Sequence, residues 1–150
     1  MKLINIFLLA MTPIGELRLS IPTGIGSDLP WLSVLLISIL GNLVPAIVLV
    51  YLFPFLEPLR YKKGFFLWVW FDKILTNIES RKKIVEKYGW IGLILLVAIP
   101  FPGTGAHTGS FVSYLMRMNK LKSLFFIFIG ICIAGFIMTL VSLGLFHFIF

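Results

Sequence analysis

The stretch TPIGELRLSIPTG (residues 12–24) interrupts a strongly apolar chain and decides how its first part folds. It follows an uncharged run that begins at Leu3, and it contains two prolines, two glycines, Glu16 and Arg18. Proline interrupts helices, and an ionisable side chain at membrane depth is costly unless it faces water or a partner. The stretch therefore predicts a break in the chain, with Glu16 and Arg18 as candidate functional residues.

The composition of the whole chain indicates a membrane protein. Hydrophobic residues make up 59% of the chain and charged residues 13%, and the mean hydropathy is +1.05. A chain with so little polar surface cannot cover a soluble core. Three windows without Asp, Glu, Lys or Arg, residues 31–56, 89–116 and 123–150, each exceed the roughly 20 residues that cross a bilayer. We expect one all-α integral membrane domain over residues 1–150.

The two halves of the chain share one layout. When residues 1–61 are laid over residues 90–150, one broken apolar segment aligns with another, and Gly41 falls on Gly130. Basic residues gather in the loops 57–88 and 117–122, so the positive-inside rule places both loops in the cytoplasm. A segment 89–116 that starts and ends inside must enter the membrane and return. The sequence thus predicts an inverted repeat with opposite topology in its two halves.

Each predicted repeat consists of a re-entrant helical hairpin followed by a transmembrane helix. Repeat 1 covers residues 1–56, repeat 2 covers residues 89–150, and the linker 57–88 is expected to be an amphipathic interfacial helix. Re-entrant backbone cannot face lipid, so the two hairpin tips should pack on each other or on a second subunit. The alternative is four plain spans. The expected breaks are Pro13, Gly15 and Pro22 in the first hairpin and Pro100, Pro102, Gly103 and Gly105 in the second.

The second hairpin, with PFPGTGAHTGS at residues 100–110, also carries candidate site residues. A half-helix beginning near Thr104 would point its amide groups and positive dipole end into the protein, which suits a phosphate or carboxylate. His107 is either a proton relay, because histidine titrates near neutral pH, or a hydrogen-bonded packing residue. Thr108 is a further polar candidate beside it. Asn42, in the first long span, indicates a kink that either serves packing or exposes carbonyl groups to a cavity.

Several classes of function are disfavoured by the sequence. There is no Ser/His/Asp arrangement, no pair of catalytic carboxylates, no P-loop and no dinucleotide fingerprint, so we expect neither an enzyme nor a cofactor. No metal cluster is visible. The net charge of +7 resides mostly in loops expected beside the inner leaflet, which favours lipid over nucleic acid as a partner.

Two motifs carry a family resemblance. PIGELRLSIPTGI (13–25) and KYGWIGLILLVAIPFPGTGAHTGSFVSYLMRM (87–118) resemble the small multidrug export protein family, which is distantly similar to the DedA/VTT superfamily of bacterial and archaeal membrane proteins. The resemblance implies two re-entrant hairpins, a location in the plasma (inner) membrane of a prokaryote, and proton-linked movement of lipid carriers or phospholipids. Glu16 and Arg18 match the acidic and basic positions of the first hairpin, whereas the arginine that DedA proteins place in the second hairpin is absent.

Three functions remain open on this basis. The first is a DedA-like transporter that moves an anionic amphiphile through a pocket of Arg18, Thr104 and Thr108, with Glu16 as proton acceptor and His107 as relay. The second is proton-coupled export of lipophilic cationic drugs, in which protons and drug compete for Glu16. The third is a non-transporting membrane scaffold or assembly factor in which the charged pair fixes the hairpin. A homodimer is expected, because one chain with two spans and two hairpins has few helices with which to enclose a transport pathway.

Overall fold

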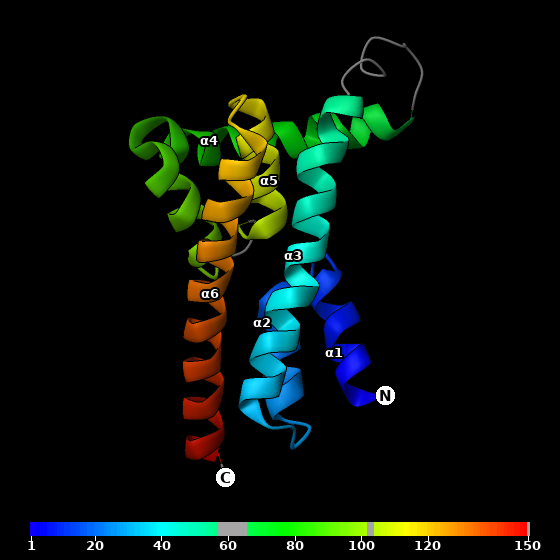
Figure 1. Ribbon diagram of the computed structural model, residues 1–150, viewed down its shortest axis with the longest axis vertical. Coiled ribbons are helices and arrows are strands. Elements are labelled where there is room, and N and C mark those ends of the chain that lie inside the picture. The colour runs from blue at the N-terminus through cyan, green and yellow to red at the C-terminus, as the bar shows by residue number, and fades with distance from the viewer. Residues whose placement is uncertain (57–65, 102–103, 150) are drawn as a thin grey trace.

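A computed structural model describes residues 1–56, 66–101 and 104–149 and shows them as helices and short turns. The predicted all-α class is confirmed, because these residues contain no strand (Figure 1). The elements in chain order are α1 (Lys2–Met11), α2 (Glu16–Ile25), α3 (Trp31–Leu56), α4 (Phe66–Ala98), α5 (Ala106–Leu115) and α6 (Lys120–Ile149).

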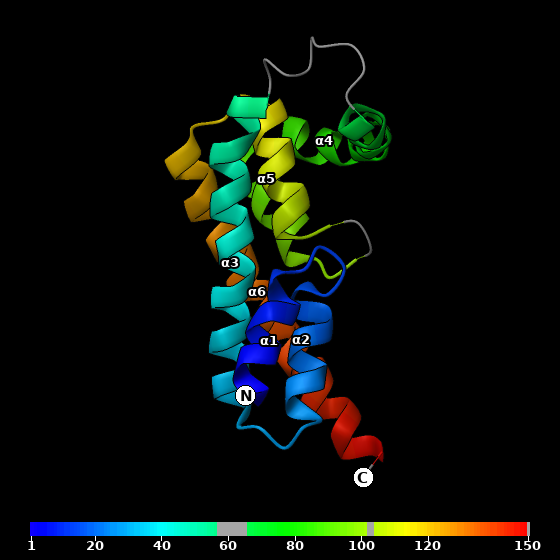
Figure 2. The same ribbon diagram turned by 90° about the vertical axis from the view of Figure 1, so that its right-hand side faces the viewer.

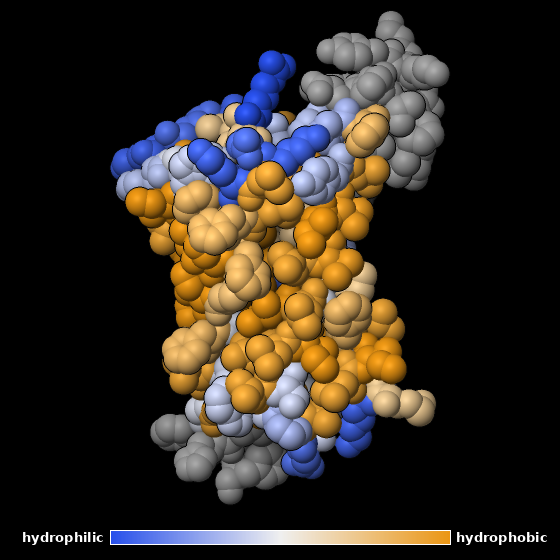
Figure 3. Space-filling model, viewed as in Figure 1, coloured by the Kyte–Doolittle hydropathy of each residue, from blue (hydrophilic) through white to orange (hydrophobic). Residues whose placement is uncertain are grey.

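Helices α3 and α6 are long and apolar enough to cross a membrane. Within them, the apolar segments Trp31–Phe55 and Lys120–Gly144 have 25 residues each. At a rise of about 1.5 Å per residue each segment exceeds the roughly 30 Å thickness of the hydrocarbon core. Figure 3 shows a broad apolar band across the face in view, with hydrophilic residues near both ends. The chain is a membrane protein, as its composition predicts.

Two short hairpins fill the space beside the long helices. The first consists of α1, the turn 12–15 and α2, and the second consists of the end of α4, the break 99–105 and α5. They approach each other from opposite ends of the molecule, with the turn 12–15 and the break facing one another (Figures 1 and 2). Helices α1, α2 and α5 have 10 residues each, about 15 Å, which is too short for any one of them to cross a bilayer alone.

The linker between the two halves is largely helical. Its predicted helix is the first part of α4, from Phe66, which lies across the long helices at one end of the molecule (Figure 2). Gly89 adopts a left-handed conformation (φ 57°, ψ −129°) and turns the chain sharply, so that the rest of α4 runs along α6. Glycine tolerates this conformation because it has no Cβ. The linker residues 57–65 lie outside the described part of the chain.

Each long helix packs against arms of both hairpins. Helix α3 contacts α1, α2, α5 and α6, and α6 contacts α2, α3, α4 and α5. Gly41 lets α3 approach the backbone of α1 at Phe7, and Gly130 lets α6 approach α4 at Val97 and at the carbonyl of Ile94. Fully buried apolar side chains fill the space between these elements, among them Ile21, Leu93, Leu96, Ile127 and Ile131.

One of the predicted breaks was wrong. Pro22 does not break the first hairpin, because it lies inside α2 and the helix continues to Ile25. The amide of Gly26 still bonds the Pro22 carbonyl at 2.9 Å, which holds the last turn although the proline lacks its own amide donor. In the second hairpin, α5 begins at Ala106, two residues after Thr104, and Gly105 (φ 126°, ψ −170°) precedes its first turn.

Candidate functional site

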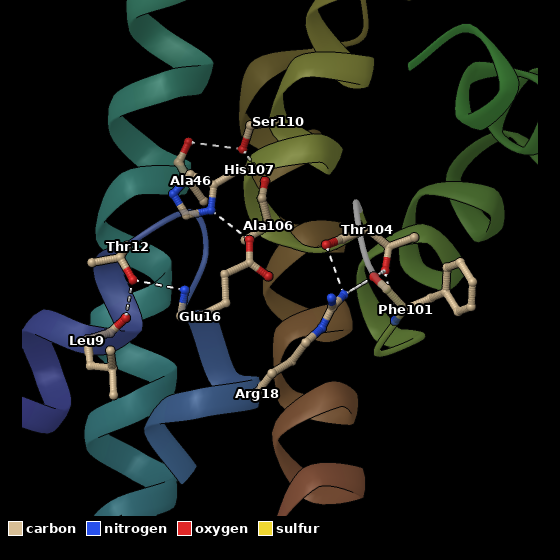
Figure 4. Close-up of polar contacts among 11 residues, drawn as sticks. Leu9, Thr12, Glu16, Arg18, Ala46, Phe101, Thr104, Ala106, His107 and Ser110 are labelled. Atoms are coloured by element: carbon tan, nitrogen blue, oxygen red, sulfur yellow. Dashed lines mark hydrogen bonds and ion pairs between the residues drawn. The ribbon is translucent and has the colours of Figure 1, made fainter. Parts of the chain in front are cut away.

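Polar side chains join the tips of the two hairpins. Glu16 and Arg18, from the start of α2, both reach residues of the second hairpin (Figure 4). Glu16 pairs with His107, whereas Arg18 bonds the backbone and side chain of the break before α5. The two residues share one pocket but use different partners, and the sequence distance between each partner pair exceeds 80 residues.

The turn between α1 and α2 sets the position of Glu16. The Thr12 hydroxyl donates to the Leu9 carbonyl at 2.8 Å and accepts from the Gly15 amide at 2.9 Å. The amide of Glu16 then bonds the Thr12 carbonyl at 3.0 Å. A side chain at position 15 would overlap Thr12 and the Leu9 carbonyl, so the turn requires glycine there. This tight turn brings the chain into α2 with Glu16 as the first helical residue.

Glu16 is a buried acid with a histidine partner. Its exposed fraction is 8%, and its Oε1 lies 2.7 Å from Nδ1 of His107. The backbone of Glu16 is in the left-handed region (φ 40°), which a non-glycine residue holds only at a cost of about 1–3 kcal/mol. A buried carboxylate is stable in an apolar setting only when it is paired or protonated. The contact with His107 allows either state.

Gly105 places the Glu16 carboxylate at the start of α5. A Cβ atom at this position would overlap both carboxylate oxygens, and the φ of 126° further disfavours any other residue. The carboxylate therefore faces the positive end of the α5 dipole, which stabilises a negative charge. The predicted anion site at this helix start is thus filled by the protein's own carboxylate.

Arg18 closes the break before α5. One terminal nitrogen donates to the Phe101 carbonyl, to the Thr104 carbonyl at 3.2 Å and to the Thr104 hydroxyl at 3.0 Å. The hydroxyl oxygen of Thr104 also accepts from the Phe101 amide at 3.1 Å. Carbonyl groups of a broken helix lack intrahelical donors, and the guanidinium satisfies them here. Much of the positive charge of Arg18 is therefore committed to joining the hairpins.

A small pocket lies between the hairpins and the long helices. Its cavity volume is about 10 Å³, room for about one water molecule and far below the roughly 300–1,000 Å³ of a typical small-molecule site. The structure therefore shows a closed state that would have to open for a drug-sized molecule. The described residues include no group of three or more His, Cys, Asp or Glu placed to hold a metal ion. The pocket is lined by Glu16, Leu17, Arg18, Asn42, Val97, Pro100, Gly105, Ala134 and Met138.

The other predicted residues have mixed positions. Pro100 lines the pocket, Pro13 is exposed at the first turn, and Pro102 and Gly103 lie outside the described residues. Thr108 is half-buried in α5 and has a contact of its own, but it is not among the pocket residues. Asn42 lines the pocket, at the position where the sequence indicated a kink that either serves packing or exposes carbonyl groups to a cavity. The sequence feature that indicates this position is its amide side chain, which lies inside an uncharged apolar run.

The fold and the site define a class: a small helical membrane protein in which two hairpins meet at a buried acid. The family described as putative small multi-drug export proteins matches residues 16–137, and the chain belongs to this family. The match extends from α2 through most of α6 and includes Glu16, Arg18, Thr104 and His107. The resemblance drawn from the two motifs is therefore confirmed, and the family description indicates a membrane transporter. No curated protein and no solved structure gives a significant match.

Proposed function

We propose that this protein is a proton-coupled exporter of lipophilic cations in the plasma membrane of a prokaryote. The observation that carries the proposal is the buried pair of Glu16 and His107, with a distance of 2.7 Å between Oε1 and Nδ1. A carboxylate in an apolar pocket binds either a proton or a cation, and the two exclude each other. That exclusion is the simplest way to couple proton entry to cation exit.

The charge balance of the junction favours a cation over an anion as substrate. An anionic amphiphile requires a positive group that is free to receive it, but Arg18 already bonds Phe101 and Thr104. The start of α5, the other anion-binding element, already faces Glu16. The carboxylate is the charged group that can exchange its partner, because displacing His107 from it leaves the Arg18 contacts intact. Glu16 is therefore assigned the substrate and proton, and His107 the role of relay.

The arrangement of the helices supports an inverted repeat of re-entrant hairpins. Gly41 and Gly130, which align in the two halves, both serve close packing of a long helix on the first arm of its own hairpin. Opposed hairpins that meet inside a protein are typical of secondary transporters, in which the site opens to alternate sides. The working cycle proposed here opens the Glu16 pocket first to one side and then to the other.

Transport by purified protein in lipid vesicles tests the proposal. A fluorescent lipophilic cation and a fluorescent phospholipid are compared under an imposed pH gradient, for the wild type, Glu16→Gln and Arg18→Lys. We expect cation movement in the wild type and none above empty vesicles in Glu16→Gln. Lys82→Ala, which removes an exposed pair with Glu86 on α4, is the matched control and should transport normally. Phospholipid movement that requires Arg18 would instead establish the anionic amphiphile.

The scaffold function is a second candidate, and one observation favours it. Glu16 and Arg18 of the first hairpin both already have partners in the second, as a purely structural clamp would require. If neither substrate moves in a demonstrably folded wild type, the scaffold becomes the better assignment.

A further inference from the structure

Three buried polar atoms on α2 and α3 have no hydrogen-bond partner among the described residues. They are the hydroxyl oxygens of Ser20 and Ser38 and Oδ1 of Asn42. The exposed fractions of these residues are 0%, 0% and 2%. Buried polar groups are almost always bonded, and water is the usual partner where the protein supplies none. A fourth such atom, the Ser123 hydroxyl, lies in the first turn of α6, outside this group.

The packing of α2 on α3 brings these residues into one row. A Cβ atom on Gly24 would lie 2.5 Å from Cγ1 of Val34, so these two positions face each other. Residues four apart share a helix face, and the two helices are antiparallel, so Ser20 falls opposite Ser38. One turn further, Glu16 falls opposite Asn42, and both line the pocket. We call this row, Ser20, Ser38 and Asn42, the polar seam.

The equivalent row in the second half of the chain is apolar. At the alignment that places Gly41 on Gly130, the counterparts of the polar seam are Gly109, Ile127 and Ile131. A Cβ atom on Gly109 would lie 3.6 Å from Cγ1 of Ile127, which reproduces the facing of Ser20 and Ser38. Ile127 and Ile131 are both 0% exposed. The packing of this fold thus does not require polar groups in the row.

We propose that water bound along the polar seam carries protons to and from Glu16. A water next to the carboxylate donates one proton to it and takes a proton from the water behind, so charge passes while each oxygen stays in place. The seam leads from the pocket toward the end of the molecule that holds the turn 26–30, opposite the basic residues 117–122 (Figure 1). Gly24 against Val34 closes it in this structure. The proposal rests on proton coupling at Glu16.

The charged and titratable groups around Glu16 are not members of the polar seam. His107 faces it from α5, and Arg18 lies beside it on α2. The remaining helices contribute pocket residues without titratable groups: Asn42 from α3, Val97 from α4, and Ala134 and Met138 from α6. His107 belongs to α5, whereas the seam lies on α2 and α3, so His107 can receive a proton from Glu16 without being part of the seam.

Infrared spectroscopy of the full chain in lipid tests the seam without any substrate. The carboxyl band of protonated Glu16 is identified by its absence in Glu16→Gln, and its shift is followed after transfer from H2O to D2O. In Ser20→Ala/Ser38→Ala we expect exchange about tenfold slower, because the proton must cross a gap without hydrogen-bond partners. Ser142→Ala is the matched control, since that hydroxyl is also buried but bonds the Met138 carbonyl at 2.6 Å.

Exchange at the wild-type rate in the double variant would overturn the seam. Ser38→Thr keeps a hydroxyl at the same position. Its exchange should therefore be much closer to the wild-type rate than that of Ser38→Ala. Equal slowing in Ser142→Ala would also overturn the seam, because it would show a general effect of removing buried hydroxyls. If the double variant slows exchange while the wild type moves no cation, the seam stands and cation export is wrong.

Discussion

Oε1 of Glu16 lies 2.7 Å from Nδ1 of His107, although the two residues are 91 positions apart in the chain. The contact joins the first residue of α2 to the first turn of α5. A proton placed on either partner keeps one hydrogen bond between them, but it changes whether the pocket holds an ion pair or a neutral pair. The junction of the hairpins is thus both a structural contact and a group that can change its charge.

Gly105→Ala should separate the two hairpins. The added methyl group overlaps the Glu16 carboxylate, and the φ of 126° strains any residue with a Cβ, so we expect a loss of about 2–4 kcal/mol. The measurement is the thermal midpoint in detergent. Gly144→Ala is the control, because a Cβ there meets nothing within 4 Å. Equal midpoints for the two variants would show that the carboxylate does not lie against Gly105.

Arg18→Lys and Thr104→Val should lose the same interaction. Lysine retains the charge, but its amino group lies one bond closer to the backbone than the arginine nitrogen that reaches two carbonyls and a hydroxyl, and valine removes the hydroxyl that accepts at 3.0 Å. Each variant should lose about 1–2 kcal/mol, and the double variant should lose less than the sum. Denaturation of all four proteins gives the coupling energy. A coupling energy of zero would exclude a direct contact.

Gly24→Ala should be destabilised by about 1–3 kcal/mol and rescued by a smaller residue on α3. The new methyl group meets Val34 at 2.5 Å, and Val34→Ala removes the atoms that it meets. The double variant Gly24→Ala/Val34→Ala should therefore be more stable than the sum of the single losses predicts. Simple additivity, measured by thermal melting, would mean that α2 and α3 do not pack in this register.

Exchange of the two charges tests the specific role of Glu16 in transport. In Glu16→Arg/Arg18→Glu both charges remain in the first hairpin, but the arginine then faces His107 and the carboxylate faces the carbonyl groups of Phe101 and Thr104. Cation transport in vesicles should fall to the level of Glu16→Gln. Full activity in the swapped protein would contradict a specific role for Glu16.

The sequence identified the hairpin junction because ionisable residues are rare in an apolar chain. Glu16, Arg18 and His107 were found in this way and Thr104 as the expected start of a half-helix, and the structure brings all four together. Which partner each one takes was not predictable, because it depends on how two segments more than 80 residues apart face each other. The two glycines that fix the junction, Gly15 and Gly105, were identified as breaks, but their contacts were not.

The wrong predictions have local physical causes. Pro22 was expected to break the first hairpin, but a helix near its end loses only one hydrogen bond to a proline. The polar seam escaped notice because serine is common in membrane helices, and only the packing of Gly24 on Val34 shows that Ser20 and Ser38 face each other. Neutral residues in a row carry no periodic signal that distinguishes them from ordinary helix contacts.

The Glu16 carboxylate seated over Gly105 has a consequence for how binding constants should be read. A side chain attached to the same chain is present at a high effective concentration, so an incoming cation exchanges with an intramolecular ligand and does not enter a vacant site. Weak apparent affinity is then compatible with strong intrinsic contacts. Substitutions that loosen His107 without touching the carboxylate should tighten the binding of every cation by the same factor, and leave the preference among them unchanged.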